Sequence, residues 1–154
     1  MKTLHVIVDL SGSMSALGKS AIAGTLLATL AALPPDCGGD ADVQRHRWDG
    51  RADTLVPLLQ TTAGEATLLV TDGYALADSA GSAAGRAVRE ALGAHTDSLF
   101  VVRCGPDAVD LAALKEFRGV PSVAAEDVLY AVETLRERSS VGGSADNASG
   151  EDWA

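Results

Sequence analysis

Short, mainly apolar runs alternate along the chain with longer segments in which apolar and polar residues recur at helical spacing. Such runs cover residues 4–8, 66–71 and 98–103, and a turn containing glycine follows each of them. This pattern is typical of central strands in a parallel sheet, because helices cover both faces of such a sheet and leave no polar side.

The segments between these strands predict helices. In residues 15–33 apolar side chains recur every three to four positions, Ser13 or Ser15 can cap the start, and two prolines follow the last apolar residue. Further helices are expected at residues 82–92, 107–117 and 126–136, with a short strand at residues 120–124. The alternation predicts an α/β fold: a doubly wound, mostly parallel central sheet with helices on both faces, as in Rossmann-like proteins.

One region departs from this alternation. Residues 41–48, a turn at Asp49-Gly50 and the apolar residues 54–59 together predict an antiparallel hairpin. The first of its strands contains the polar run Gln44-Arg45-His46-Arg47. It is therefore expected at an edge of the sheet or exposed to a partner.

The length of 154 residues suits one domain that needs neither disulfides nor a metal to hold its core. We expect this domain to span residues 1–137. Residues 138–154 are rich in Gly, Ser, Asp and Asn, and apart from Trp153 they offer little to bury, so they predict a disordered acidic tail. The two cysteines, Cys37 and Cys104, are too few for a disulfide framework.

Net charge and hydropathy narrow the range of functions that the chain could have. A net charge of −9 argues against binding to nucleic acid or to anionic membranes, which depends on clustered Lys and Arg. No apolar run approaches the roughly 20 residues that span a bilayer, and no cleavable leader is evident. The cytoplasm is the expected compartment.

Oxygen-bearing side chains gather where two predicted strands end. Asp9 follows the first strand and Asp72 a later one, and ligands of open α/β sheets bind beyond the carboxyl ends of the strands. Ser11 and Ser13 add hydroxyl groups at alternate positions of the first loop. These hard oxygen donors suit Mg²⁺ or Mn²⁺ better than zinc, so the sequence predicts a divalent cation site.

These residues also carry a resemblance. Asp9-Leu10-Ser11-Gly12-Ser13 resembles the metal-ion-dependent adhesion site (MIDAS) of von Willebrand factor A (vWA) domains, an Asp-x-Ser-x-Ser motif after the first strand. Val70-Thr71-Asp72-Gly73 is similar to the run in which that family carries a further aspartate. The resemblance implies a shortened, bacterial-type vWA domain over residues 1–137. It also implies Mg²⁺, or Mn²⁺ or Ca²⁺, that the serines contact directly and the aspartates largely through water.

Such a site implies a function in binding. Neutral hydroxyl ligands leave much of the ion's charge uncompensated, so the ion takes one more anionic oxygen from an Asp or Glu of a partner protein. No general base or activated nucleophile stands out in these loops, and we therefore expect an adaptor or scaffold, not an enzyme. Resemblance places such bacterial domains beside AAA+ ATPases or in multi-gene defence or signalling systems.

The chain also departs from the family. vWA domains take a threonine ligand from a loop before a helix between their third and fourth strands, and here that stretch is reduced to residues 60–65. Thr61 and Thr62 are then expected at the opposite edge of the sheet, away from the ion. Water or a side chain such as Asp49 is expected to fill the missing position.

Two alternatives stay open. Residues 12–20 resemble the phosphate-binding loop of nucleotide hydrolases, although one residue too many separates the first glycine from Gly18-Lys19-Ser20. Under that interpretation the protein is an enzyme and Lys19 binds phosphate, whereas otherwise Lys19 is expected at a solvated helix position. The second alternative is a metal-free scaffold that uses only the polar hairpin.

Overall fold

A five-stranded, all-parallel sheet forms the centre of the protein. The computed structural model describes residues 1–34, 41–95 and 97–147. The strands are β1 (Thr3–Asp9), β2 (Asp42–Trp48), β3 (Thr67–Thr71), β4 (Leu99–Arg103) and β5 (Ser122–Ala124), in the order β2-β1-β3-β4-β5. Every pairing is parallel, which confirms the predicted α/β class.

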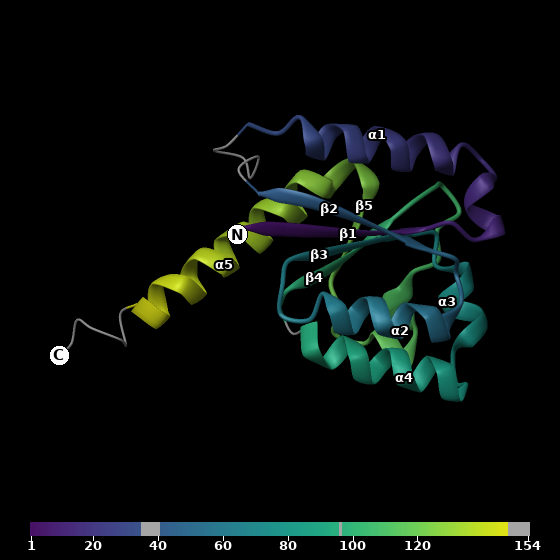
Figure 1. Cartoon of the computed structure of the whole chain (residues 1–154). Coiled ribbons are helices and arrows are strands. Elements are labelled where there is room, and N and C mark those ends of the chain that lie inside the picture. The colour runs from purple at the N-terminus through teal and green to yellow at the C-terminus, as the bar shows by residue number, and fades with distance from the viewer. Residues whose placement is uncertain (35–40, 96, 148–154) are drawn as a thin grey trace.

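Helices cover both faces of this sheet (Figure 1). One face packs against α1 (Lys19–Ala31) and α5 (Val128–Asn147), and the other against α2 (Ala52–Thr61), α3 (Tyr74–Ser79) and α4 (Ala83–Leu92). The doubly wound arrangement is thereby confirmed. Among the helices of the described part of the chain, none is long and apolar enough to cross a membrane.

The strands alternate their side chains between two apolar cores. In β1, Leu4, Val6 and Val8 join the core under α1 and α5, whereas Ile7 joins the core under α2 and α4. Both sets are buried, which explains why β1 is mainly apolar.

The predicted hairpin is wrong. Residues 54–59 belong to α2, because Ala52, Leu55 and Leu59 recur at helical spacing and all three are buried. β2 pairs in parallel with β1 and is the outermost strand on that side, so its predicted place at an edge is confirmed. α2 therefore begins at the carboxyl edge of the sheet, next to the end of β1.

Two predicted helices also differ from the structure. The first begins at Lys19, after a separate 3₁₀ turn, η1 (Gly12–Ser15), and its N-cap is Gly18, so neither Ser13 nor Ser15 caps it. Residues 107–117 form only the 3₁₀ turns η4 (Leu111–Ala113) and η5 (Lys115–Phe117). The backbone before η4 is held instead by contacts with the loop after β3.

The last helix is longer than predicted. α5 continues past residue 136 to Asn147, into the segment in which a tail is expected. Arg138 anchors this continuation, since its guanidinium donates to the carbonyl of Asp97 at 3.2 Å and lies 5.4 Å from the ring centre of Phe100. Residues 148–154, with Trp153, and Cys37 lie outside the described residues.

Candidate cation site at the carboxyl edge of the sheet

Asp9 ends β1 and has no exposed surface. The backbone N–H of Ser11 donates to its Oδ1 at 2.8 Å, and the hydroxyl of Thr71 donates to its Oδ2 at 2.7 Å. These two bonds fix the plane of the carboxylate. Among the described residues, no Lys, Arg or His lies within ion-pair distance of Asp9. Asp9 is thus a buried carboxylate held by dipoles alone.

Ser11 and Ser13 bring two hydroxyl oxygens to within 3.3 Å of each other in the turn after Asp9. Both side chains are partly exposed. The turn packs tightly against the loop after β2: a Cβ on Gly50, whose φ is +92°, would lie 2.4 Å from the Cβ of Ser11. Adjacent oxygens around Mg²⁺ lie about 3 Å apart when each is about 2.1 Å from the metal. The two serines therefore have the spacing of neighbouring ligands.

Asp72 directly follows β3 and is also fully buried. Its Oδ1 accepts the backbone N–H of Tyr74 at 3.2 Å, and its Oδ2 accepts the ammonium group of Lys19 at 3.0 Å. Lys19 is 1% exposed. Burial by itself lowers the pKa of Lys19, but hydrogen bonds and charge interactions with Asp107 and Asp72 outweigh it and raise the pKa above its usual value. Lys19 is therefore a fixed positive charge.

Asp107, in the loop after β4, is the second partner of that ammonium group. Its Oδ1 lies 2.9 Å from Lys19 Nζ, its Oδ2 accepts the hydroxyl of Tyr74 at 3.1 Å, and its side chain is 34% exposed. The hydrogen bond from Lys19 lowers the pKa of Asp107, and the one from Tyr74 acts in the same direction. The backbone N–H of Val109 donates to the carbonyl of Asp72 at 2.8 Å and ties the two loops together.

The four predicted ligands fit a divalent cation in part. Asp9, Ser11 and Ser13 lie together in one turn, but Oδ2 of Asp72 already accepts a hydrogen bond from Lys19. Three carboxylates against one ammonium leave the cluster with two negative charges, the charge that a divalent ion neutralises. Within the described residues no group of three or more His, Cys, Asp or Glu side chains could hold a metal, so a cation at this edge would need the hydroxyls of Ser11 and Ser13 as well.

The other residues that the sequence analysis weighed as ligands lie at different edges of the sheet. Thr61 and Thr62 end α2, where their hydroxyls donate to the helix carbonyls of Pro57 and Leu58, away from Asp9 and Asp72 as expected. Asp49 lies at the carboxyl edge beside Gly50. Hydrogen bonds from the hydroxyl of Thr54 and the backbone N–H of Arg51 lower its pKa. It is the nearest additional carboxylate in the loop that packs on Ser11.

Lys19 does not occupy the solvated position that was expected of it. The sequence contains a signal for its burial, because Lys19 shares one helical stripe with Ala23, Leu26 and Leu30, which are all buried. Asp107 had no comparable signal, since it lies in a loop that reaches Lys19 only through the order of the strands.

The first loop also differs from a phosphate cradle. The backbone N–H groups of Met14, Ala16 and Lys19 donate to the carbonyls of Ser11, Ser13 and Ala16 within the loop itself. Because these groups already have acceptors, they do not point together at an outside anion.

Away from this edge, polar groups pair with one another. His5 Nδ1 lies 2.9 Å from His46 Nε2, and His5 Nε2 lies 3.2 Å from Glu65 Oε2. Burial lowers the pKa of His46, and the charge of His5 lowers it further. At the carboxyl edge itself, Cys104 has no exposed surface, its thiol donates to the carbonyl of Lys19 at 3.5 Å, and burial raises the pKa of the thiol.

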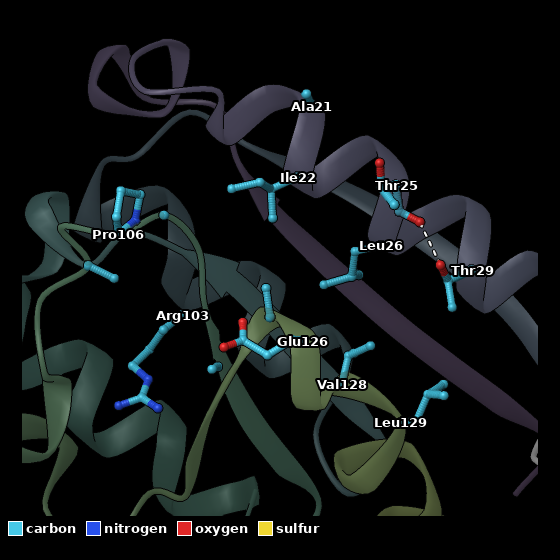
Figure 2. A pocket seen from close by; sticks show the side chains of 14 residues that line it. Ala21, Ile22, Thr25, Leu26, Thr29, Arg103, Pro106, Glu126, Val128 and Leu129 are labelled. Carbon is cyan, nitrogen blue, oxygen red and sulfur yellow. Dashed lines mark hydrogen bonds between the residues drawn. The ribbon is translucent and has the colours of Figure 1, made fainter.

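A pocket of about 810 Å³ opens between α1 and the start of α5 (Figure 2). Ile22 and Leu26 of α1 face Val128 and Leu129 across it. None of the four predicted ligands lines this pocket, so it is separate from the candidate cation site.

Comparison with known proteins yields no match, either to a model of a protein family or among curated proteins. The vWA resemblance therefore depends on the motif residues themselves.

Proposed function

We propose that this chain is a vWA-type protein-interaction domain. It holds a magnesium-class ion at Asp9, Ser11, Ser13 and Asp72 and offers that ion to an Asp or Glu side chain of a partner protein. The domain acts as an adaptor or scaffold, in keeping with the AAA+ ATPase or multi-gene bacterial systems that the resemblance suggests.

A single observation carries the proposal: Asp9 is fully buried, lacks a cationic partner among the described residues, and lies beside two hydroxyl oxygens 3.3 Å apart. A buried carboxylate without a counter-charge is costly unless hydrogen bonds or a cation compensate it. Two donors meet part of that need, and a cation next to Ser11 and Ser13 would meet the rest.

The chain's own residues prepare this edge for a partner. Thr71 and the N–H of Ser11 fix Asp9, and the close approach of Gly50 fixes the turn that carries Ser11. Ser11 and Ser13 are partly exposed, so the ion would face the outside of the protein. When bound, the ion supplies a positive charge that attracts an anionic oxygen and needs no catalytic group.

Calorimetric titration with Mn²⁺ and with Mg²⁺ tests the metal site. Wild type is compared with the double variant Ser11→Ala/Ser13→Ala and with Ser15→Ala, a matched control from the same 3₁₀ turn whose exposed hydroxyl donates to the carbonyl of Gly12. We expect binding in wild type and Ser15→Ala and a loss in the double variant. No heat of binding in wild type, or equal binding in all three, contradicts the proposal.

The two alternatives have distinct outcomes. Nucleotide binding that Lys19→Ala abolishes would favour the phosphate-loop enzyme, although the internal hydrogen bonds of that loop argue against it. Partner capture that is unchanged by EDTA and by Asp9→Ala would favour a metal-free scaffold. Capture that EDTA abolishes and Mn²⁺ restores would support the metal-dependent domain.

A further inference from the structure

Lys19 holds a permanent positive charge beside Asp72, one of the proposed metal ligands. Its ammonium group lies 3.0 Å from Asp72 Oδ2 and 2.9 Å from Asp107 Oδ1, and it donates to the carbonyl of Ser13 at 3.4 Å. The last contact matters because Ser13 is itself a proposed ligand. The ammonium group thus lies immediately behind the cation site.

The packing around Lys19 leaves its stem little freedom. A Cβ on Gly105 would lie 2.7 Å from Lys19 Cε, so this glycine closes over the stem with no space to spare. The ring centre of Tyr74 lies 5.1 Å from the ammonium nitrogen on another side, within the range of a cation–π contact. The charge is therefore held in place and cannot swing out to water.

We propose that Lys19 is a built-in competitor of the divalent ion for Asp72, which weakens ion binding by the domain alone. This inference depends on the proposed metal site. Like charges close together in a partly buried region repel strongly, so a divalent ion next to Ser13 is less stable with Lys19 present than without it.

The balance of charge gives this competition a consequence. Asp9, Asp72 and Asp107 carry three negative charges, and Lys19 offsets one of them. The two negative charges that remain are those that a divalent ion neutralises, whereas without Lys19 the edge would keep one negative charge in excess. Lys19 therefore weakens ion binding and also removes the excess negative charge that would repel an acidic partner.

Asp107 has the opposite effect. As the second acceptor of the Lys19 ammonium, it draws part of that charge away from Asp72, and its negative charge favours a cation nearby. When the charge of Asp107 is removed, Asp72 is the only carboxylate that pairs with the Lys19 ammonium group among the described residues. Lys19→Met and Asp107→Asn are therefore expected to change ion affinity in opposite directions.

The test is a calorimetric titration with Mn²⁺ alone on wild type, Lys19→Met and Asp107→Asn. We expect Lys19→Met to bind at least about tenfold tighter than wild type and Asp107→Asn several-fold weaker. Thermal unfolding with and without Mn²⁺ is a second readout, in which Mn²⁺ raises the Tm of Lys19→Met more than that of wild type. Circular dichroism establishes that each variant is folded, and Asp107→Asn still tests the competition if Lys19→Met does not fold.

The outcomes separate this inference from the proposed function. If wild type binds Mn²⁺ through Ser11 and Ser13 but Lys19→Met binds equally or more weakly, or Asp107→Asn binds more tightly, the competition is refuted and the metal site stands. If Lys19→Met binds and wild type does not, the competition is supported, but the proposed function of the unmodified chain is contradicted. If neither wild type nor any variant binds Mn²⁺, both the site and the competition are refuted.

Discussion

Replacing Thr71 by valine keeps the shape of the side chain and removes the hydroxyl group that donates to Asp9. Both residues are buried, and the same oxygen also accepts the backbone N–H of Gly73 at 3.0 Å. A hydrogen bond to a charged group contributes about 1.5–3 kcal/mol, and an unpartnered buried N–H adds about 1 kcal/mol of cost. We expect Thr71→Val to lower the free energy of unfolding by about 2.5–4 kcal/mol and the Tm by roughly 5–15 °C.

Thr67 offers a matched control at the other end of the same strand. It has no exposed surface, and its hydroxyl donates to the carbonyl of Glu65, a neutral acceptor, at 2.8 Å. Thr67→Val is expected to lower the free energy of unfolding by about 1 kcal/mol. Urea unfolding at pH 7.5 in EDTA, followed by circular dichroism, measures both. Equal losses in the two variants would refute the view that Thr71 supports a buried carboxylate at Asp9.

Three further predictions concern other parts of the fold. Burial lowers the pKa of His95 and the charge of His5 lowers it further, although the hydrogen bond to the carbonyl of Leu59 acts to raise it. The contribution of neutral His95 to the free energy of unfolding is therefore fully present above the unfolded pKa of about 6.5 and is lost as the pH falls below it. Urea unfolding at pH 7.5 and 5.5 should therefore show a smaller loss for His95→Gln than for wild type, and an equal loss contradicts this. Gly50→Ala, with φ at +92° and its Cβ 2.4 Å from that of Ser11, should lower the Tm and weaken Mn²⁺ binding together, and unchanged values in both measurements contradict the close packing. In the variant Cys37→Ser, the thiol of Cys104 should react with Ellman's reagent only on unfolding, because it has no exposed surface and a raised pKa, and rapid reaction in the folded variant contradicts that burial.

Strands β1, β3 and β4 were predictable because each is buried on both faces and is followed by a turn that contains glycine. Residues 54–59 were misassigned for a related reason, since a short apolar run suits a strand or a buried helix equally, and only Ala52 before it reveals the helical spacing with Leu55 and Leu59. The prediction of a helix at residues 107–117 is wrong for another reason. Contacts of Asp107 with Lys19 and of Val109 with Asp72 override the local helical preference. Such contacts between distant segments leave no periodic pattern in the sequence.

In the candidate site too, contacts within one local segment were predictable from the sequence, whereas contacts between distant segments were not. Asp9, Ser11 and Ser13 are close together in the sequence and adopt one local turn, so their convergence follows from the motif. The structure adds Lys19, which contacts Asp72, and Asp107, which contacts Lys19 from the loop after β4. Their long-range pairing changes the expected chemistry, because the site contains a cation of its own.

The most direct test of the cation site is crystallographic. Crystals soaked in Mn²⁺, with data collected near the manganese absorption edge, locate the ion by its anomalous signal. We expect a peak within bonding distance of the hydroxyl oxygens of Ser11 and Ser13, beside Asp9 and Asp72. The ammonium group of Lys19 is then expected to lie closer to Asp107 than to Asp72. A map with no peak at this edge, in crystals where Mn²⁺ binds elsewhere, would contradict this account.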